Sequence, residues 1–142
     1  MTLEFFQAAE ADKKYLLQLR KQTMTQHLER TGQYLSDEQH ANRVDYEFAC
    51  SHIVFHQGVR IGFAKFRSTP EELEIIQVQV DPKQQRKGYG TDIIMEIMQR
   101  RQAKTLKLTV LKGNPAVDLY TRLGFKIVRE DNYEYHMHYM RE

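Results

Sequence analysis

The residues of this chain best suited to chemistry form a glycine-containing turn, VDPKQQRKGYGT, at residues 80–91. Gly88 and Gly90 stand between an apolar run that ends at Pro82 and a segment of helical periodicity. Glycines let the backbone turn tightly and approach another molecule closely, and the first turn of a helix presents N–H groups without an intrahelical acceptor. Such a turn predicts a binding site for a phosphate group.

Known phosphate-binding patterns narrow this prediction. The P-loop pattern G-x-x-x-x-G-K-[ST] is absent, and the dinucleotide-binding fingerprint needs a third glycine where Ile93 stands. The pattern Q/R-x-x-G-x-G/A, between a strand and a helix, is met by Gln85, Gly88 and Gly90. The alternative is that the glycines only form a turn and that the basic residues beside them are solvated charges.

A second segment, NPAVDLYTRLGF at residues 114–125, predicts a short helix. Asn114 suits the N-cap, Pro115 the first turn, and Gly124 the position just past the end. One face of this helix is expected to carry Ala116, Leu119, Tyr120 and Leu123. We therefore expect Tyr120 to pack in the core, from where its hydroxyl can still reach a crevice.

The two motifs, in this order and separated by one expected helix and one expected strand, resemble the GNAT superfamily of N-acetyltransferases. The glycine turn matches the superfamily's pyrophosphate-binding pattern, and residues 114–125 match a later helix in their Asn, Ala, Leu-Tyr and Gly-Phe positions. The resemblance covers about residues 50–128, while the first fifty residues fit only as a strand followed by helices. It implies an α/β (α+β) fold with a mixed, mainly antiparallel central sheet, a splayed parallel pair of central strands and flanking helices. It also implies acetyl-coenzyme A (acetyl-CoA) as the co-substrate.

The resemblance further implies which residues hold acetyl-CoA. Backbone N–H groups of residues 86–91 would bind the pyrophosphate, with help from the Thr91 hydroxyl and from nearby basic side chains. Backbone groups of Val78 and Val80 would hold the pantetheine arm and the thioester carbonyl, and Asn114 would either contact that arm or serve only as a helix cap. The implied cofactor-binding set is Val78, Val80, Gln85, Arg86, Lys87, Gly88, Tyr89, Gly90, Thr91 and Asn114.

Acetyl transfer to an amine needs a proton donor for the departing thiolate and a base for the amine. The resemblance implies Tyr120 as the general acid, with a purely structural core tyrosine as the alternative. We predict Glu74 as the base, because some superfamily members carry a glutamate there and because it alternates with apolar Ile76, Val78 and Val80. Two alternatives stay open: Glu74 can pair with a nearby Lys or Arg, and a bulge would invert the alternation.

The remaining periodicity predicts the elements that position these residues. Strands are expected at residues 3–9, 51–57, 59–68, 72–80, 105–111, 125–128 and 133–140, and helices at 12–32, after a capping box at Ser36 and Gln39, after Gly90, and at 114–124. Because a helix separates the strands at 72–80 and 105–111, these two are expected to be parallel and joined by a right-handed crossover.

Length and composition limit the classes of function. A chain of 142 residues suits a single domain, residues 1–142. Its 21 basic and 19 acidic residues nearly balance, which gives no broad field for nucleic acid or a membrane surface. No apolar run is long enough to span a bilayer, the first residues do not resemble a signal peptide, and Cys50 is the only cysteine. We therefore expect a soluble, cytoplasmic protein that binds neither nucleic acid nor membrane.

Two functions remain open at this point. The first is an enzyme that moves the acetyl group of acetyl-CoA to a primary amine of a small molecule or peptide, by direct attack within a ternary complex. The second is a non-catalytic acyl-CoA sensor or interaction module. The acceptor pocket is expected between residues 25–37 and 128–134, where acidic residues either attract a cationic acceptor or are simply solvated. These residues are Glu29, Asp37, Glu38 and Asp131.

The last expected strand carries two further groups. His136 and His138 share one strand face, but no third ligand accompanies them, so we predict cross-strand packing and no metal site. An aromatic and apolar set on the same strand either joins the core or forms a contact in a homodimer. This set is Tyr133, Tyr135, Met137 and Tyr139.

Overall fold

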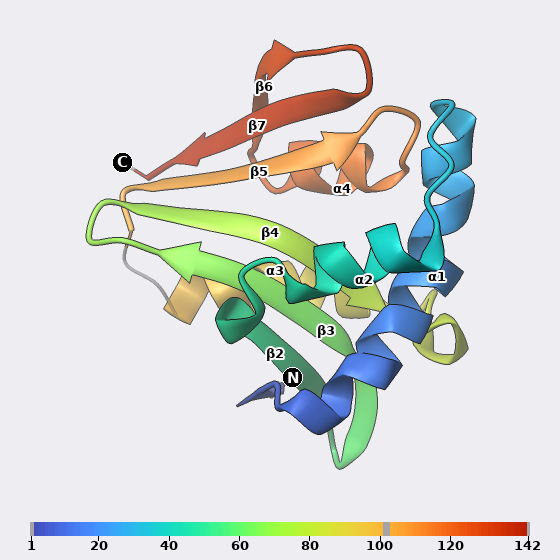
Figure 1. Ribbon diagram of the computed structural model, residues 1–142. Helices are drawn as coiled ribbons and strands as arrows, with labels where there is room; N and C mark the ends of the chain where they lie inside the picture. The colour runs from blue at the N-terminus through green and yellow to red at the C-terminus, as the bar shows by residue number, and fades with distance from the viewer. Residues whose placement is uncertain (1, 101–102, 142) are drawn as a thin grey trace.

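The computed structural model describes residues 2–100 and 103–141 and contains a seven-stranded sheet in the order β1-β2-β3-β4-β5-β7-β6 (Figure 1). The strands are β1 (Glu4–Gln7), β2 (Ser51–His56), β3 (Val59–Ser68), β4 (Glu72–Val80), β5 (Thr105–Leu111), β6 (Lys126–Glu130) and β7 (Glu134–Met140). The pair β4 and β5 is parallel, and the other neighbouring pairs are antiparallel. The predicted fold class, including the parallel central pair, is confirmed.

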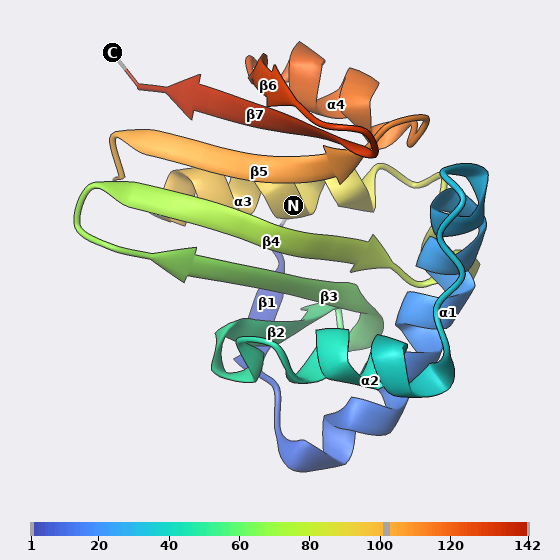
Figure 2. The same ribbon diagram turned by 45° about the horizontal axis from the view of Figure 1, so that its top comes forward.

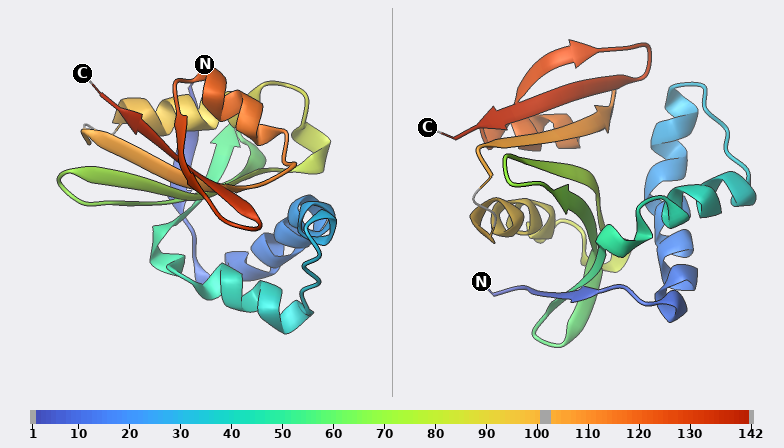
Figure 3. Two further views of the ribbon diagram at one scale, coloured as in Figure 1. Left: turned by 90° about the horizontal axis from the view of Figure 1, so that it is seen from above. Right: turned by 60° about the vertical axis from the view of Figure 1, so that its left-hand side comes forward.

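Helices cover both faces of this sheet. They are α1 (Lys13–Arg30), α2 (Asp37–Asp45), α3 (Tyr89–Arg100) and α4 (Ala116–Arg122). Seen from above, α3 and α4 lie on one face, and α1 and α2 lie on the other (Figure 3). The sequence predicted all four, although the helix expected from Asn114 begins at Ala116, with Pro115 at its N-cap.

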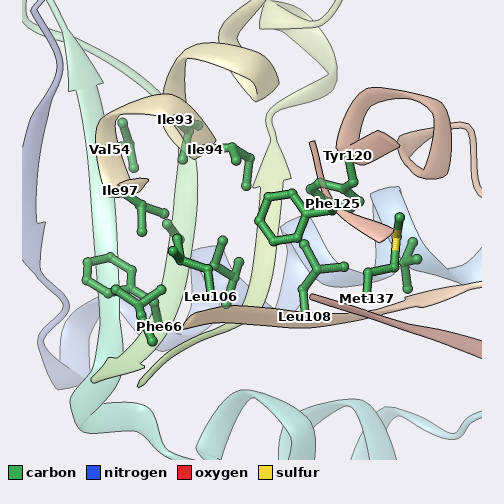
Figure 4. Close-up of a cluster of buried hydrophobic side chains, with 14 of the residues drawn as sticks. Val54, Phe66, Ile93, Ile94, Ile97, Leu106, Leu108, Tyr120, Phe125 and Met137 are labelled. Carbon is green, nitrogen blue, oxygen red and sulfur yellow. The ribbon is translucent and has the colours of Figure 1, made fainter. Parts of the chain in front are cut away.

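The larger core lies between the sheet and α3, and its side chains are shown in Figure 4. Ile93, Ile94 and Ile97 of α3 are fully buried because their spacing places all three on the face that meets the sheet. A smaller cluster under α1 contains Leu16 and Leu19. The two clusters place α3 and α1 on opposite faces of the sheet.

A bulge in β4 changes which side chains share a face. Phe66 pairs with Ile75, whereas the preceding β3 residue, Lys65, pairs with Gln77. Ile76 is therefore the extra residue. Val78 packs against the larger core on the α3 side, whereas Gln77 lies opposite Lys65, on the other face. The predicted alternation of Glu74 with Val78 and Val80 is therefore wrong, and the alternative left open, a bulge that inverts it, is observed.

Buried Lys65 anchors α2 to the sheet. Its Nζ donates hydrogen bonds to the carbonyl oxygens of Arg43 at 3.1 Å and Val44 at 3.2 Å, at the end of α2, and to that of Tyr46. Burial lowers the pKa of this ammonium to about 8. The other end of α2 is fixed by the predicted capping box, in which Ser36 accepts from the N–H of Gln39. The C-terminal end of α2 is thus held against β3, and its N-terminal end is capped.

Gly62 brings β3 and β4 unusually close together just before the glycine turn. A Cβ at this position would lie 2.1 Å from the Gln79 carbonyl oxygen and 3.0 Å from Val80 Cα. We expect Gly62→Ala to lower the free energy of unfolding by about 1–3 kcal/mol, because the backbone must move to accept the methyl group. Urea denaturation measures this loss. The control is Gly90→Ala, whose Cβ would meet its nearest atoms at 3.9 Å; equal stability of the two variants would contradict the prediction.

Candidate functional site

The two central strands separate halfway along their length. The β4–β5 ladder runs from the pair of Glu72 with Thr105 to the pair of Ile75 with Leu108 and then stops, although both strands continue. Figure 2 shows the two strands diverging toward the end at which α1 lies. The second half of β4 therefore has backbone groups that face β5 without pairing to it.

The register of β4 identifies these backbone groups. The N–H of Asp81 donates to the carbonyl of Ile61 at 2.8 Å, so the residues that alternate with Asp81 point toward β3. By the same alternation, the N–H groups of Val78 and Val80 point away from β3, toward the gap. The carbonyl of Val80 points the same way and accepts a hydrogen bond from Gln85 Nε2 at 3.1 Å. This geometry agrees with the role that the resemblance implied for both valines.

A cavity of about 360 Å³ occupies the gap between the strands. Asn114 and Tyr120 line it from the α4 side, and residues 74–79 and 108–111 line it from the strands. On the α1 and α2 side its walls are Arg20, Met24, Leu28, Gln33, Leu35, Arg43 and Tyr46, and the remaining wall is Tyr133, Glu134 and His136. Because the lining residues come from both faces, the cavity passes through the sheet, and it uses both segments predicted for the acceptor pocket.

The glycine turn has the geometry of an anion-binding loop. Arg86 and Gly88 adopt positive φ angles of 66° and 81°, which reverse the chain direction just before α3. Among the described residues, no backbone acceptor is found for the N–H groups of residues 86–91. The next N–H, that of Asp92, donates to the Gly88 carbonyl at 3.1 Å. The N–H groups of residues 86–91 are therefore available to an anion at the positive end of the helix dipole.

Side chains of the turn mainly hold it in shape. Gln85 is bonded to the end of β4, Lys87 Nζ donates to Gln84 at 3.1 Å, and the Tyr89 hydroxyl lies 3.0 Å from His56 Nδ1. A Cβ on Gly90 would lie 3.9 Å from side chains of Leu119 and Val80. Gln85 and Tyr89 thus brace the turn.

Tyr120 is buried in the larger core and also lines the cavity. Its ring packs edge-on against Phe125, with centroids 5.9 Å apart (Figure 4). Burial raises the pKa of its hydroxyl to about 12, so the group is protonated at neutral pH. Asn114 Oδ1 accepts the N–H of Ala116 at 2.9 Å while Asn114 also lines the cavity. Both residues therefore combine a structural position with access to the cavity.

Glu74 lines the cavity but is not a free carboxylate. Its Oε1 accepts a hydrogen bond from Arg67 Nη2 at 2.6 Å, and Arg67 also pairs with Glu47 at 3.4 Å. The open alternative of an ion pair with a nearby arginine is thus observed. Because of the bulge, Glu74 lies on the face of β4 opposite the core that contains Val78.

His136 lines the same cavity within a short chain of polar contacts. Its Nε2 lies 3.1 Å from Asp131 Oδ2, and its Nδ1 lies 3.1 Å from Thr109 Oγ1. A neutral ring with its proton on Nε2 donates to Asp131 and accepts from Thr109, which satisfies both contacts. No group of three or more His, Cys, Asp or Glu side chains suited to a metal ion occurs within residues 2–100 and 103–141.

Asp131 fixes the turn between β6 and β7. Its carboxylate accepts from His136 and from the backbone N–H groups of Tyr133 and Glu134, and these bonds lower its pKa from 3.8 to about 2. A carboxyl whose pKa is lower in the folded state stabilises the fold above pH 3.8 and loses that contribution as the pH falls toward 2. We expect Asp131→Asn to be less stable than wild type at pH 6 and the gap to shrink below pH 4. Urea denaturation across this range measures it, and a gap that does not change with pH would contradict the assignment.

The polar residues of the cavity wall that sequence reasoning missed include Arg20 and Gln79. Both are buried, at 4% exposure each. A signal for the first existed: Leu16, Arg20, Met24 and Leu28 lie four residues apart on one helix face, so an arginine interrupts an apolar stripe. The four acidic residues expected to attract a cationic acceptor do not line the cavity, and two of them, Asp37 and Asp131, are held by Lys21 and His136.

Comparison with solved structures finds the same fold in several acetyltransferases. PaiA N-acetyltransferase from Thermoplasma acidophilum, solved with coenzyme A, has 18% identity and a TM-score of 0.73, with 99% of this chain and 100% of that chain covered. An acetyltransferase from Thermus thermophilus has 13% identity and a TM-score of 0.79 (99% and 98% covered). The N-acetyltransferase PseH from Campylobacter jejuni, solved with acetyl-CoA, has 21% identity and a TM-score of 0.66 (99% of both chains).

Two further findings bear on the class of protein. Among the helices of residues 2–100 and 103–141, none has the length and apolar character needed to cross a membrane. A search of curated proteins returned no match. The model of the acetyltransferase (GNAT) family, however, matches residues 14–125, which is most of the chain. With its splayed β4–β5 pair and its glycine turn ahead of α3, this protein belongs to the acetyltransferase (GNAT) family.

Proposed function

We propose that the protein transfers the acetyl group of acetyl-CoA to a primary amine of a small molecule, by direct attack within a ternary complex. The observation that carries this proposal is the cavity through the sheet. Its α4 side is lined by the buried Tyr120, and its other side is lined by residues of α1 and α2. A donor and an acceptor can thus enter from opposite faces and meet between β4 and β5.

Acetyl-CoA would bind along the α3 and α4 face. The free N–H groups of residues 86–91 would hold the pyrophosphate, because a helix N-terminus favours an anion, and Lys83, Arg86 and Thr91 lie within or beside that turn. The gap-facing backbone groups of Val78 and Val80 would pair with the pantetheine arm as a further strand pairs with a sheet edge. Two structural relatives were solved with coenzyme A or acetyl-CoA, which supports acetyl-CoA as the ligand.

The reaction needs one bond made and one broken. The amine nitrogen forms a bond to the thioester carbonyl carbon, the carbon–sulfur bond breaks, and the products are an N-acetyl amine and coenzyme A. The N–H groups of Val78 and Val80 would stabilise the oxyanion, since they face the gap without a strand partner. Tyr120 would give its proton to the departing thiolate, and the amine would lose a proton to a base.

Among the groups in the cavity wall that can take the amine proton are Glu74 and His136. We retain Glu74 as our proposal, acting through the oxygen that does not accept from Arg67. We expect Glu74→Gln to lower kcat/KM about 100-fold at pH 7 and to change the shape of its pH profile. Initial rates between pH 5 and 9 measure both. An unaltered profile would exclude Glu74 and leave the His136–Asp131 pair, whose own variant His136→Gln is the matched comparison.

A thiol-detection assay tests the proposed function. The protein is mixed with acetyl-CoA and a panel of primary amines, and free coenzyme A is followed with time. We expect release that depends on the amine and an N-acetylated product by mass spectrometry. Tight binding of acetyl-CoA without amine-dependent release would instead indicate an acyl-CoA sensor, the alternative function.

The remaining proposals concern the setting of the protein. A cytoplasmic location and the absence of nucleic-acid and membrane partners stay predictions. A homodimer through the C-terminal strands also stays a prediction: Met137 is fully buried in the core, whereas Tyr133 is 45% exposed beside β7. Analytical ultracentrifugation would decide the oligomeric state.

A further inference from the structure

We propose that the acceptor carries a carboxylate beside its amine and that Arg20, with Arg43, binds this carboxylate in the cavity wall under α1 and α2. The inference rests on the proposed function, because it names the class of acceptor. It assigns a free amino acid with an apolar side chain, rather than a simple alkylamine or a polyamine, to the part of the cavity under α1 and α2.

Arg20 has the position of a ligand-binding arginine. Arg20 is only 4% exposed, yet it lines the cavity. Its Nε donates to His40 Nδ1 at 3.1 Å, which fixes the plane of the guanidinium. Its Nη1 is buried and has no hydrogen-bond partner within the described residues. One edge of the guanidinium is thus held by the protein, and Nη1 is left as a buried donor without an acceptor.

The charge of Arg20 is not neutralised by the protein. No carboxylate lies within ion-pair distance of Arg20 or Arg43 among residues 2–100 and 103–141. Burial, and then the neighbouring charge of Arg43, lower the pKa of Arg20 to about 10. A buried cation next to a like charge is costly for the fold unless an anion compensates it. A bound carboxylate, which matches the two-pronged geometry of a guanidinium, supplies that compensation.

Other cavity residues define the rest of the acceptor. The amide of Gln79 is buried in the same wall, and neither its Nε2 nor its Oε1 has a partner in the described structure. Met24, Leu28 and Leu35 add apolar surface that suits an aliphatic side chain. The cavity wall has two acidic residues, Glu74 and Glu134, and the carboxylate of Glu74 is already paired with Arg67.

The size of the cavity favours a free amino acid over a protein tail. At about 360 Å³ it falls at the lower end of small-molecule sites, and the same space must admit the end of the pantetheine arm. A single amino acid has the three groups that the walls address: a carboxylate for Arg20, an amine for the thioester, and a side chain for the apolar residues.

Matched acceptor pairs test the proposal. Each pair consists of an amino acid and the amine that remains after its carboxyl group is removed, such as leucine with 3-methylbutylamine and methionine with 3-(methylthio)propylamine. We expect wild type to acetylate the amino acid with a kcat/KM about 10- to 100-fold above that of its partner, the worth of a charge-assisted bidentate contact. Equal or higher rates for the decarboxylated amines would overturn the proposal while leaving the proposed function intact.

Variants then connect this preference to the arginines. Arg20→Lys keeps the positive charge but loses the paired N–H donors of the guanidinium. Arg43→Gln removes an exposed cation that can be changed without disturbing the core. We expect both to raise KM for leucine and to leave the KM for 3-methylbutylamine within about twofold. Lys21→Gln is the matched control, because it removes a charge from α1 outside the cavity. If Arg20→Lys fails to fold, Arg43→Gln still decides the question, and an unchanged KM in it would count against the proposal.

A binding measurement separates this inference from the proposed function. Calorimetric titration of N-acetylleucine into the coenzyme A-saturated protein reports on the carboxylate site without any turnover. Binding that is weakened about tenfold or more in Arg43→Gln, in a protein that acetylates no amine, would sustain the carboxylate site and reject the enzyme. Turnover of amines with no binding of N-acetylleucine would support the enzyme and reject the carboxylate site.

Discussion

Replacing Tyr120 by phenylalanine is expected to lower kcat about 100-fold or more and to leave the Kd for acetyl-CoA within about twofold. The reason is that Tyr120 keeps its proton at neutral pH, since burial raises its pKa to about 12, and its hydroxyl is the group on the α4 side of the cavity suited to protonate a thiolate. Phenylalanine keeps the ring that packs against Phe125, so the fold should survive. Steady-state kinetics and calorimetry on the same sample measure the two effects.

Tyr139→Phe is the matched control for this variant. The Tyr139 ring also packs against Phe125, with centroids 5.6 Å apart, but Tyr139 does not line the cavity. We expect this variant to keep wild-type kcat. If Tyr120→Phe also keeps it, Tyr120 is only a core residue, and the thiolate receives its proton from another group or from water.

Gly88→Val is expected to weaken acetyl-CoA binding about 100-fold. Gly88 has a φ of +81°, a conformation in which a β-branched side chain is strained, so valine should shift the backbone of the turn. The N–H groups of residues 86–91 then no longer converge on one anion, and the loss of two hydrogen bonds to a charged group, at about 1.5 kcal/mol each, accounts for the size of the effect. Calorimetric titration with acetyl-CoA measures it.

Gly58→Val provides the control for strain. Gly58 lies in the β2–β3 turn with a φ of +79°, and a Cβ added there, as at Gly88, would have no atom within 4 Å. Both variants should therefore lose similar stability, whereas only Gly88→Val should lose acetyl-CoA affinity. Similar affinities in the two variants would mean that the turn is structural and that the coenzyme binds elsewhere.

Patterns that depend on neighbours in sequence predicted most of the fold. The stripe of Ile93, Ile94 and Ile97 identified α3, and Ser36 with Gln39 identified the start of α2. The strand–helix–strand order around α3 predicted that β4 and β5 are parallel. These features are set by local geometry, namely helical periodicity, capping and chain connectivity, which is why one sequence suffices to find them.

Features that depend on distant partners were not predictable in the same way. The bulge at Ile76 depends on how β4 pairs with β3, and no residue type within β4 fixes its position. The Asp131–His136 contact depends on how the β6–β7 turn folds back. Arg20 was a different case, since its place in the apolar stripe of α1 was visible, but its exposure to a cavity depends on how far β4 and β5 diverge.

Calorimetric titration of acetyl-CoA into the folded wild-type protein tests the central claim most directly. That claim is that the backbone amides of residues 86–91, together with the gap-facing edge of β4, form the binding site for this thioester. The account predicts saturable binding of one molecule per chain with a Kd below about 1 mM, the range in which enzymes bind their substrates. No heat of binding at millimolar acetyl-CoA, in a sample whose cooperative unfolding shows that it is folded, would contradict it.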